Sequence, residues 1–150
     1  MKLSCLQENL SKGLGIVGRA VATRSTLPIT QNVLISTEKS RVKLAATNLE
    51  IAITYWIAAK VTEQGEITVP ARLFTDFVNS LPNDKIDMSL SAKTKALEMK
   101  CARFSGRING MTADEFPPIP AVGDGPTTTI DPDDLRTAIA KVVFAAATEE

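Results

Sequence analysis

Two amphipathic stripes at helical spacing, separated by alternating segments, constrain the fold of this chain more than any other feature. The first stripe has an apolar residue every three or four positions: Leu6, Leu10, Leu14, Val17 and Val21. The second follows Pro70, which suits the first turn of a helix, and consists of Leu73, Phe74, Phe77, Val78 and Leu81. Segments within residues 31–57 and 86–108 alternate between apolar and polar side chains, as half-buried strands do. This order predicts an α+β domain in which two helices pack on antiparallel sheets.

The outward faces of both predicted helices carry cations. Lys12 and Arg19 lie seven residues apart, opposite the apolar stripe of the first helix, and Arg72 has an outward position on the second. The ordinary interpretation is a solvated surface, on which Arg72 pairs with Asp76 for only about 0.3–0.5 kcal/mol. The alternative is that these cations contact the phosphates of DNA.

The charge balance changes sign along the chain. The net charge is zero, but residues 1–122 hold 15 Lys and Arg against 11 Asp and Glu, whereas residues 123–150 hold 2 against 6. This imbalance is far smaller than that of a typical nucleic-acid-binding domain, so DNA binding would need the basic groups gathered on one face. No apolar run approaches the ~20 residues of a membrane span, and no signal-peptide pattern opens the chain. We therefore expect a cytoplasmic protein.

Residue types that catalyse reactions or bind metals are scarce. The chain has no histidine and two cysteines, which excludes a Cys/His zinc cluster and a nucleophile activated by histidine. Cys5 and Cys101 lie in alternating apolar segments, so we interpret both as small buried hydrophobic residues rather than a redox pair. An enzyme using carboxylates alone is open by residue type, but Asp114 and Glu115 adjoin a proline-rich segment and are poorly placed to hold a substrate. We expect no catalytic activity, no cofactor and no metal.

A segment rich in proline and glycine divides the chain. Six Pro or Gly residues lie between Pro117 and Pro126. Beyond them, Asp131 and Pro132 form a strong helix start, with an aspartate cap followed by proline in the first turn. When shifted by 125 residues, the apolar residues of this helix match those of the first helix: Leu135 with Leu10, Ile139 with Leu14, and Val142 with Val17. We predict a first domain over residues 1–120, followed over residues 121–150 by a linker and the start of a similar domain.

Five short blocks in a fixed order point to a family. In the first block, Arg24 precedes a turn at Leu27-Pro28 that is expected to open a strand. Together the blocks resemble the bacterial DNA sliding clamp, the beta subunit of DNA polymerase III: residues 24–29, 47–50, 69–72, 77–82 and 114–117. The resemblance covers the first clamp domain and the start of the second.

The resemblance implies a clamp protomer that consists of three similar domains. Two such protomers would close into a homodimeric ring around duplex DNA. Such a ring does no chemistry. It holds DNA polymerase III on DNA, and a separate clamp loader opens it. The present chain would be an N-terminal fragment of that protein.

The family pattern also assigns candidate residues. It makes Arg24 and Arg72 the DNA-contact candidates, to which the helical wheel adds Lys12 and Arg19. It implies that the contact between protomers has a basic side, formed by Lys100, Arg103 and Arg107. Glu149 stands where the family has a polar residue that contacts DNA, but a glutamate would repel phosphate.

Several alternatives remain beside these assignments. The three basic residues of the predicted protomer contact could instead protect an edge strand against aggregation. Tyr55 and Trp56 could stack on bases, although their place in an alternating strand favours packing. For the whole protein, the alternative is an α+β protein-interaction module that does not bind DNA.

Overall fold

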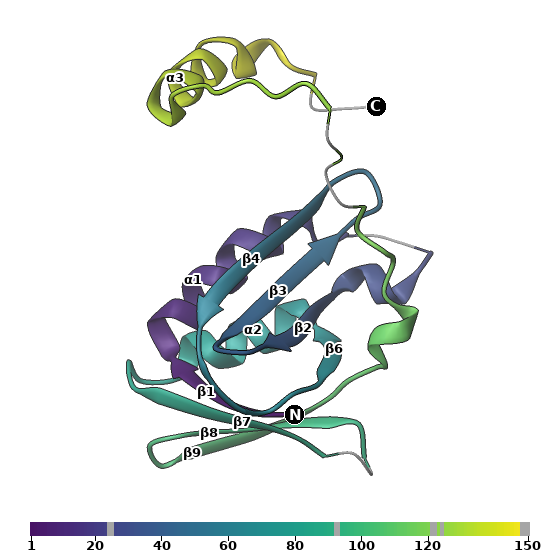
Figure 1. Ribbon diagram of the computed structural model, residues 1–150, viewed down its shortest axis with the longest axis vertical. Coiled ribbons are helices and arrows are strands. Elements are labelled where there is room, and N and C mark those ends of the chain that lie inside the picture. The colour runs from purple at the N-terminus through teal and green to yellow at the C-terminus, as the bar shows by residue number, and fades with distance from the viewer. Residues whose placement is uncertain (24–25, 92–93, 121–122, 124, 148–150) are drawn as a thin grey trace. The chain divides into compact units, whose positions relative to one another are not determined.

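The computed structural model describes residues 1–23, 26–91, 94–120, 123 and 125–147, and it forms two compact units (Figure 1). The first unit comprises Met1–Ile119 and the second Pro120–Glu150. In the first unit, two antiparallel sheets and two helices include the segments that the alternation and the helical stripes indicated, together with a strand at Lys60–Glu63 that the alternation did not indicate.

The larger sheet, sheet A, has five antiparallel strands in the order β5-β1-β7-β8-β9. Its strands are β1 (Lys2–Leu6), β5 (Lys60–Glu63), β7 (Lys85–Ser91), β8 (Ala96–Cys101) and β9 (Phe104–Asn109). Sheet B has four strands in the order β4-β3-β2-β6, namely β2 (Asn32–Glu38), β3 (Arg41–Thr47), β4 (Ala52–Ala58) and β6 (Glu66–Pro70). A single residue, Ala59, carries the chain from β4 to β5 and so from one sheet to the other.

The two helices are α1 (Gln7–Val17) and α2 (Ala71–Ser80). Sheet B covers one side of them in Figure 1, and α1 packs against β3 and β4. The inner faces of the two sheets and the inner stripes of the helices enclose one core, in which the largest buried side chains include Phe74, Leu10, Leu14 and Leu97. The hydrophobic effect of this shared core therefore holds both sheets and both helices together.

Two residues of the predicted helical stripes are not in the core. Leu6 is 47% exposed because it ends β1, where the alternation that buries Leu3 and Cys5 turns it outward. Leu73 is 56% exposed because it lies one position, about 100° of helical rotation, from the buried Phe74. The first helix ends at Val17 and is followed by a 3₁₀ turn (Gly18–Ala20), so Val21, the last residue of the predicted stripe, lies beyond the helix.

The predicted turn at Leu27-Pro28 does not lead directly into a strand. Pro28 begins a 3₁₀ turn (Pro28–Gln31), and β2 starts at Asn32. The fixed φ of proline suits the first position of such a turn, which Thr30 stabilises by donating its Oγ1 hydrogen to the Leu27 carbonyl at 2.7 Å.

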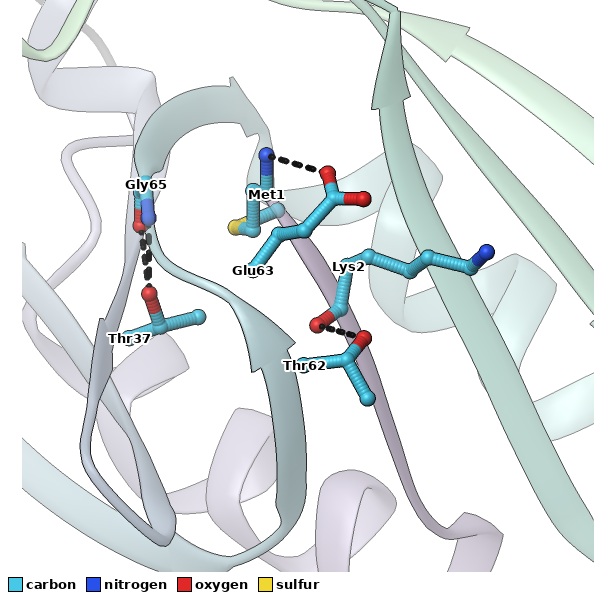
Figure 2. A network of polar contacts seen from close by, with 6 residues as sticks. All are labelled: Met1, Lys2, Thr37, Thr62, Glu63 and Gly65. Carbon is cyan, nitrogen blue, oxygen red and sulfur yellow. Dashed lines mark hydrogen bonds and ion pairs between the residues drawn. The ribbon is translucent and has the colours of Figure 1, made fainter.

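The crossing from β5 to β6 is fixed by polar contacts between the sheets (Figure 2). Thr37 of β2 donates its Oγ1 hydrogen to the Gly65 carbonyl at 3.0 Å and accepts the Gly65 N–H at 2.8 Å. A Cβ at Gly65 would lie only 2.9 Å from Met1 Cβ. Thr62 donates to the Lys2 carbonyl at 3.1 Å, and the Met1 ammonium lies 4.0 Å from a Glu63 carboxylate oxygen. These contacts tie the start of β1 to β5, and they tie the connection between β5 and β6 to β2.

The second unit contains α3 (Pro132–Val142), which begins where the Asp-Pro pattern predicted. The Asp131 carboxylate accepts the backbone N–H groups of Asp133 and Asp134 at 2.9 and 3.3 Å, as an N-cap does. The apolar stripe of α3 is exposed over Leu135, Ile139 and Val142. Across the described part of the chain, every helix is too short or too polar to cross a membrane.

Candidate nucleic-acid interface

The two helices of the first unit lie side by side and are joined by side-chain hydrogen bonds. The Ser11 hydroxyl donates to Asn79 Oδ1 at 2.7 Å, and Gln7 Nε2 donates to the Val78 carbonyl at 2.9 Å. Because the buried stripe of each helix faces the core, the outward faces form one continuous surface, here called the helix side. Sequence reasoning did not find these bonds, since partners 68 and 71 residues apart leave no local pattern.

The helix side brings three of the four predicted DNA-contact residues together. Lys12, on α1, and Arg19, on the 3₁₀ turn after it, are exposed. The Arg72 side chain is 95% exposed, and its Nε lies 4.0 Å from Asp76 Oδ2, the longest separation that counts as an ion pair. An exposed pair of this length holds the arginine weakly, so its guanidinium is available to a ligand.

Glu8 on α1 is also exposed on this side, as Asp76 is on α2. Among the described residues, the helix side therefore carries three cations and two carboxylates. This near balance supports at most weak attraction for phosphates. Arg24 and Glu149 lie outside the described residues.

The three predicted protomer-contact residues lie on the last two strands of sheet A and in the turn between them. Lys100 lies on β8, and Arg107 lies on the edge strand β9, directly opposite Glu98. Arg103 lies in the turn between these strands, with its guanidinium carbon 5.5 Å from the centre of the Phe104 ring. An exposed aromatic ring beside an arginine on an edge strand is suited to contact with another protein surface.

The adjacent aromatic residues of β4 have opposite environments. Tyr55 packs against the core, as expected. The expectation of packing is wrong for Trp56, which is 44% exposed because alternation turns it to the outer face of sheet B. Its Nε1 donates to Glu38 Oε1 at 3.3 Å, and the guanidinium carbon of Arg41 lies 5.4 Å from its ring centre. Hydrogen bonds from Trp56 and Arg41 lower the pKa of the Glu38 carboxyl.

The cysteines are buried in the core, as the sequence predicted. Burial, with a smaller contribution from Asp87, raises the pKa of the Cys5 thiol to about 12, and burial also raises the pKa of Cys101. Ile86 of β7 lies between them, paired with Cys5 on one side and Cys101 on the other. Two strand spacings place their Cα atoms roughly 10 Å apart, beyond the ~7 Å limit for a disulfide. Neither a thiolate nor a disulfide is favoured at this site.

The remaining chemically active side chains do not converge. Asp114 and Glu115 are exposed on a 3₁₀ turn (Ala113–Glu115), and Glu115 accepts a hydrogen bond from the Thr112 hydroxyl at 3.0 Å. Within the described ranges, no group of three or more His, Cys, Asp or Glu residues is arranged to hold a metal ion. The strongest functional geometry in the first unit is thus the shared surface of two helices.

Comparison with known proteins gives this surface a context. Residues 1–120 match the family model of the DNA polymerase III beta subunit, N-terminal domain. The beta sliding clamps of Synechocystis sp. and Synechococcus elongatus are 35% and 34% identical to the chain, over all of it and over 40% of their own length.

Solved structures agree. The chain superposes on a putative DNA polymerase III beta subunit from Eubacterium rectale with a TM-score of 0.93 and 30% identity, covering 99% of this chain and 40% of that one. The beta sliding clamp of C. crescentus gives a TM-score of 0.91 and 32% identity, covering 100% and 40% respectively. These likenesses confirm the predicted α+β clamp fold. The chain spans about 40% of the length of the relatives it matches, and it belongs to the family of the bacterial DNA polymerase III beta subunit.

Proposed function

We propose that the chain is the N-terminal part of a sliding clamp, a cytoplasmic, non-catalytic protein that encircles duplex DNA and holds the replicative polymerase on it. The observation that carries the proposal is the family match over residues 1–120, which includes both helices of the helix side. In the complete protein, two protomers form the ring, a clamp loader opens it, and DNA polymerase III binds to it. This chain supplies the first domain and the start of the second.

The helix side supplies the surface that faces DNA. Phosphate contacts carry no sequence information, so a ring that slides needs cations placed to meet the backbone without reading base edges. Lys12, Arg19 and Arg72 have this character because all three are exposed on one surface. Arg24 joins them by the family pattern. The carboxylates of Glu8 and Asp76 keep the attraction weak, which suits movement along the duplex.

The edge strand β9 supplies the contact with the second protomer. An edge strand has unpaired backbone groups that can continue a sheet in a partner. Arg103 and Phe104 add a charged and an aromatic side chain beside it. Lys100 and Arg107 extend the basic character of this edge onto the sheet face.

The proposal is tested on the full-length protein with closed circular and linear duplex DNA. We expect the ring to stay on circles and to slide off linear ends. Arg24→Ala with Arg72→Ala should lower retention on circles without unfolding the protein, because Arg72 makes no buried contact. Each lost phosphate contact should reduce the slope of log affinity against log salt by about 0.9.

Arg41→Ala provides a matched control, since this arginine is exposed on sheet B, where it interacts with Glu38 and Trp56. Its retention on circles should equal that of the parent. Equal dissociation from circles and linear DNA would contradict the clamp proposal, and the absence of binding to either DNA would favour an interaction module that does not bind DNA. A marked preference for one DNA sequence would also contradict it.

A further inference from the structure

The outer face of sheet A is a second basic surface, of which the proposed function uses only Lys100 and Arg107, beside the β9 edge. Residues paired directly across antiparallel strands share a face, so one row contains Lys60, Ser4, Asp87 and Lys100. The next row contains Glu63, Lys2, Ser89, Glu98 and Arg107, and the Glu63 carboxylate lies 4.0 Å from the Met1 ammonium. The alternate residues of β1, β7 and β8, such as Leu3, Met88 and Met99, are buried in the core. The polar rows therefore face away from it.

This face is hollowed rather than flat. A depression of about 450 Å³ is lined by four lysines (Lys2, Lys60, Lys85 and Lys100), by the hydroxyls of Ser4, Thr62 and Ser89, and by Asp87 and Glu98. Lys85 Nζ lies 3.2 Å from Asp87 Oδ1, so these two charges largely neutralise each other. Among the described residues, the other three lysines have no ion-pair partner within 4.0 Å, and the carboxylate of Glu98 has none either. The depression thus has an excess of positive charge held by amines without a partner.

We propose that this depression binds the phosphate backbone of single-stranded nucleic acid. Lysine amines and serine or threonine hydroxyls are the side-chain groups that contact phosphates. Among the described residues of this face, Leu6 is the one large apolar side chain and no aromatic ring is present. An acidic protein segment would lack the buried aromatic or apolar anchors that stabilise protein interfaces. Base stacking is also absent, so binding depends on the backbone alone.

The shape of the depression favours a single strand over a duplex. Duplex DNA is stiff over about 50 nm and would touch only the rim of a concave surface, whereas a single strand bends locally to reach the amines inside. Three lysines without partners would give a slope of about −2 for log affinity against log salt, at ~0.7 per phosphate of a single strand. Such binding is weak and independent of sequence.

The test measures binding of the 150-residue chain to a labelled oligothymidylate of about 20 nucleotides by fluorescence anisotropy, from about 20 to 200 mM salt. The double substitution Lys2→Gln with Lys60→Gln should make the salt dependence shallower, changing the slope of log affinity against log salt from about −2 to about −0.7. It should weaken binding most at low salt. Lys2→Arg with Lys60→Arg should restore both, because the charge is kept. Lys39→Gln with Lys95→Gln removes two exposed lysines elsewhere and should behave as the parent. Circular dichroism of each variant verifies that the fold is intact.

Several results would overturn the assignment. One is the absence of salt-dependent binding at the lowest salt, and another is full retention of binding in the Lys2→Gln, Lys60→Gln variant. Loss of all binding in a Lys12→Gln, Arg19→Gln variant would place the site on the helix side instead. Tighter binding of polyglutamate, or of a duplex of equal length, through the same lysines would replace the ligand proposed. Lys2 and Lys60, the residues changed in this test, have no part in the proposed clamp function, and retention on circular DNA is measured with Arg24 and Arg72. Failure of one proposal is therefore distinguishable from failure of the other.

Discussion

Gly13 and Gly15 lie two positions apart on α1 but have opposite surroundings. A Cβ at Gly13 would lie 2.8 Å from Leu44 Cδ1 and 3.2 Å from Tyr55 Cδ1, so a larger residue would displace core side chains. A Cβ at Gly15 would have no neighbouring atom within 4 Å. Glycine is therefore required at the first position by packing, whereas at the second it only lowers helix propensity.

This contrast predicts opposite effects of the same substitution. Gly15→Ala should raise the free energy of unfolding by about 0.5–1 kcal/mol, because alanine favours the helix and meets no atom. Gly13→Ala should lower it by about 1–3 kcal/mol through overpacking against sheet B. Urea unfolding of the two variants and the parent measures both changes. A stabilising Gly13→Ala would show that Leu44 and Tyr55 can move aside freely.

The buried Cys5 thiol predicts a loss of stability at alkaline pH. Its pKa is raised from 9.0 to about 12 in the folded state. Below pH 9 the thiol is protonated in both states, so its contribution is fully present. As pH rises above 9, the unfolded state releases the proton while the folded state retains it, which lowers the free energy of unfolding by up to about 1.4 kcal/mol per pH unit.

The measurement is urea unfolding between pH 8 and about 10, comparing the parent with a Cys5→Ala variant. The variant should lose stability more slowly above pH 9. Groups that titrate in both proteins cancel in this comparison. Equal slopes above pH 9 would mean that the Cys5 thiol is not shielded from water as the structure shows.

At the scale of elements, the turn of the β8–β9 hairpin contains a residue with an unfavourable backbone conformation. Cys101 pairs with Phe104, so Ala102 and Arg103 form the turn, and Ala102 has a φ of 49°. A left-handed conformation costs an L-residue with a Cβ roughly 1 kcal/mol, a cost that glycine avoids. The strain is located where the hairpin presents Arg103 and Phe104, the residues proposed to contact a second protomer.

Two substitutions of Ala102 test how much the left-handed backbone of this turn lowers the free energy of unfolding. Ala102→Gly should raise the free energy of unfolding by about 0.5–1 kcal/mol, since Ala102 is exposed and loses no packing. Ala102→Val should lower it, because a β-branched residue tolerates a positive φ least. Thermal unfolding of the pair measures the difference. If the two variants have the same melting temperature, the turn does not hold the conformation seen here.

At the scale of the whole molecule, the two units differ in how much apolar surface they bury. The first encloses a core between two sheets and two helices. The second has a helix of 11 residues whose apolar side chains are exposed within the unit. An isolated helix shorter than about 12 residues is marginal in water, so most of the stability of this chain is expected in the first unit.

Limited proteolysis tests this difference. Trypsin should cut first after Arg136 and Lys141 on α3, well before it cuts after Lys12 on the packed helix α1. Mass spectrometry of the early fragments identifies the sites. Early cleavage at Lys12, with α3 intact, would show that the stabilities of the units are reversed. In the full-length protein the same α3 sites should be cut more slowly if further chain covers the helix.

Local sequence patterns account for the α+β class, for most of the buried stripes of α1 and α2, and for the cap of α3. Each depends on neighbours a few positions apart, where helical and strand periods act. The sequence also located Cys5 and Cys101 in the core, because alternation alone decides which face of a strand is buried.

The surfaces of the protein depend on contacts between residues that are distant in the sequence. Leu6 and Leu73 fit a helical stripe in the sequence, but the end of a strand and the rotation of α2 expose them. The Ser11–Asn79 bond and the lysines of sheet A join residues that are distant along the chain, so no local pattern encodes them. Strand pairing and packing between the sheets bring these residues together. Such non-local contacts stabilise the protein only after the entropy of closing the long loops between them has been overcome.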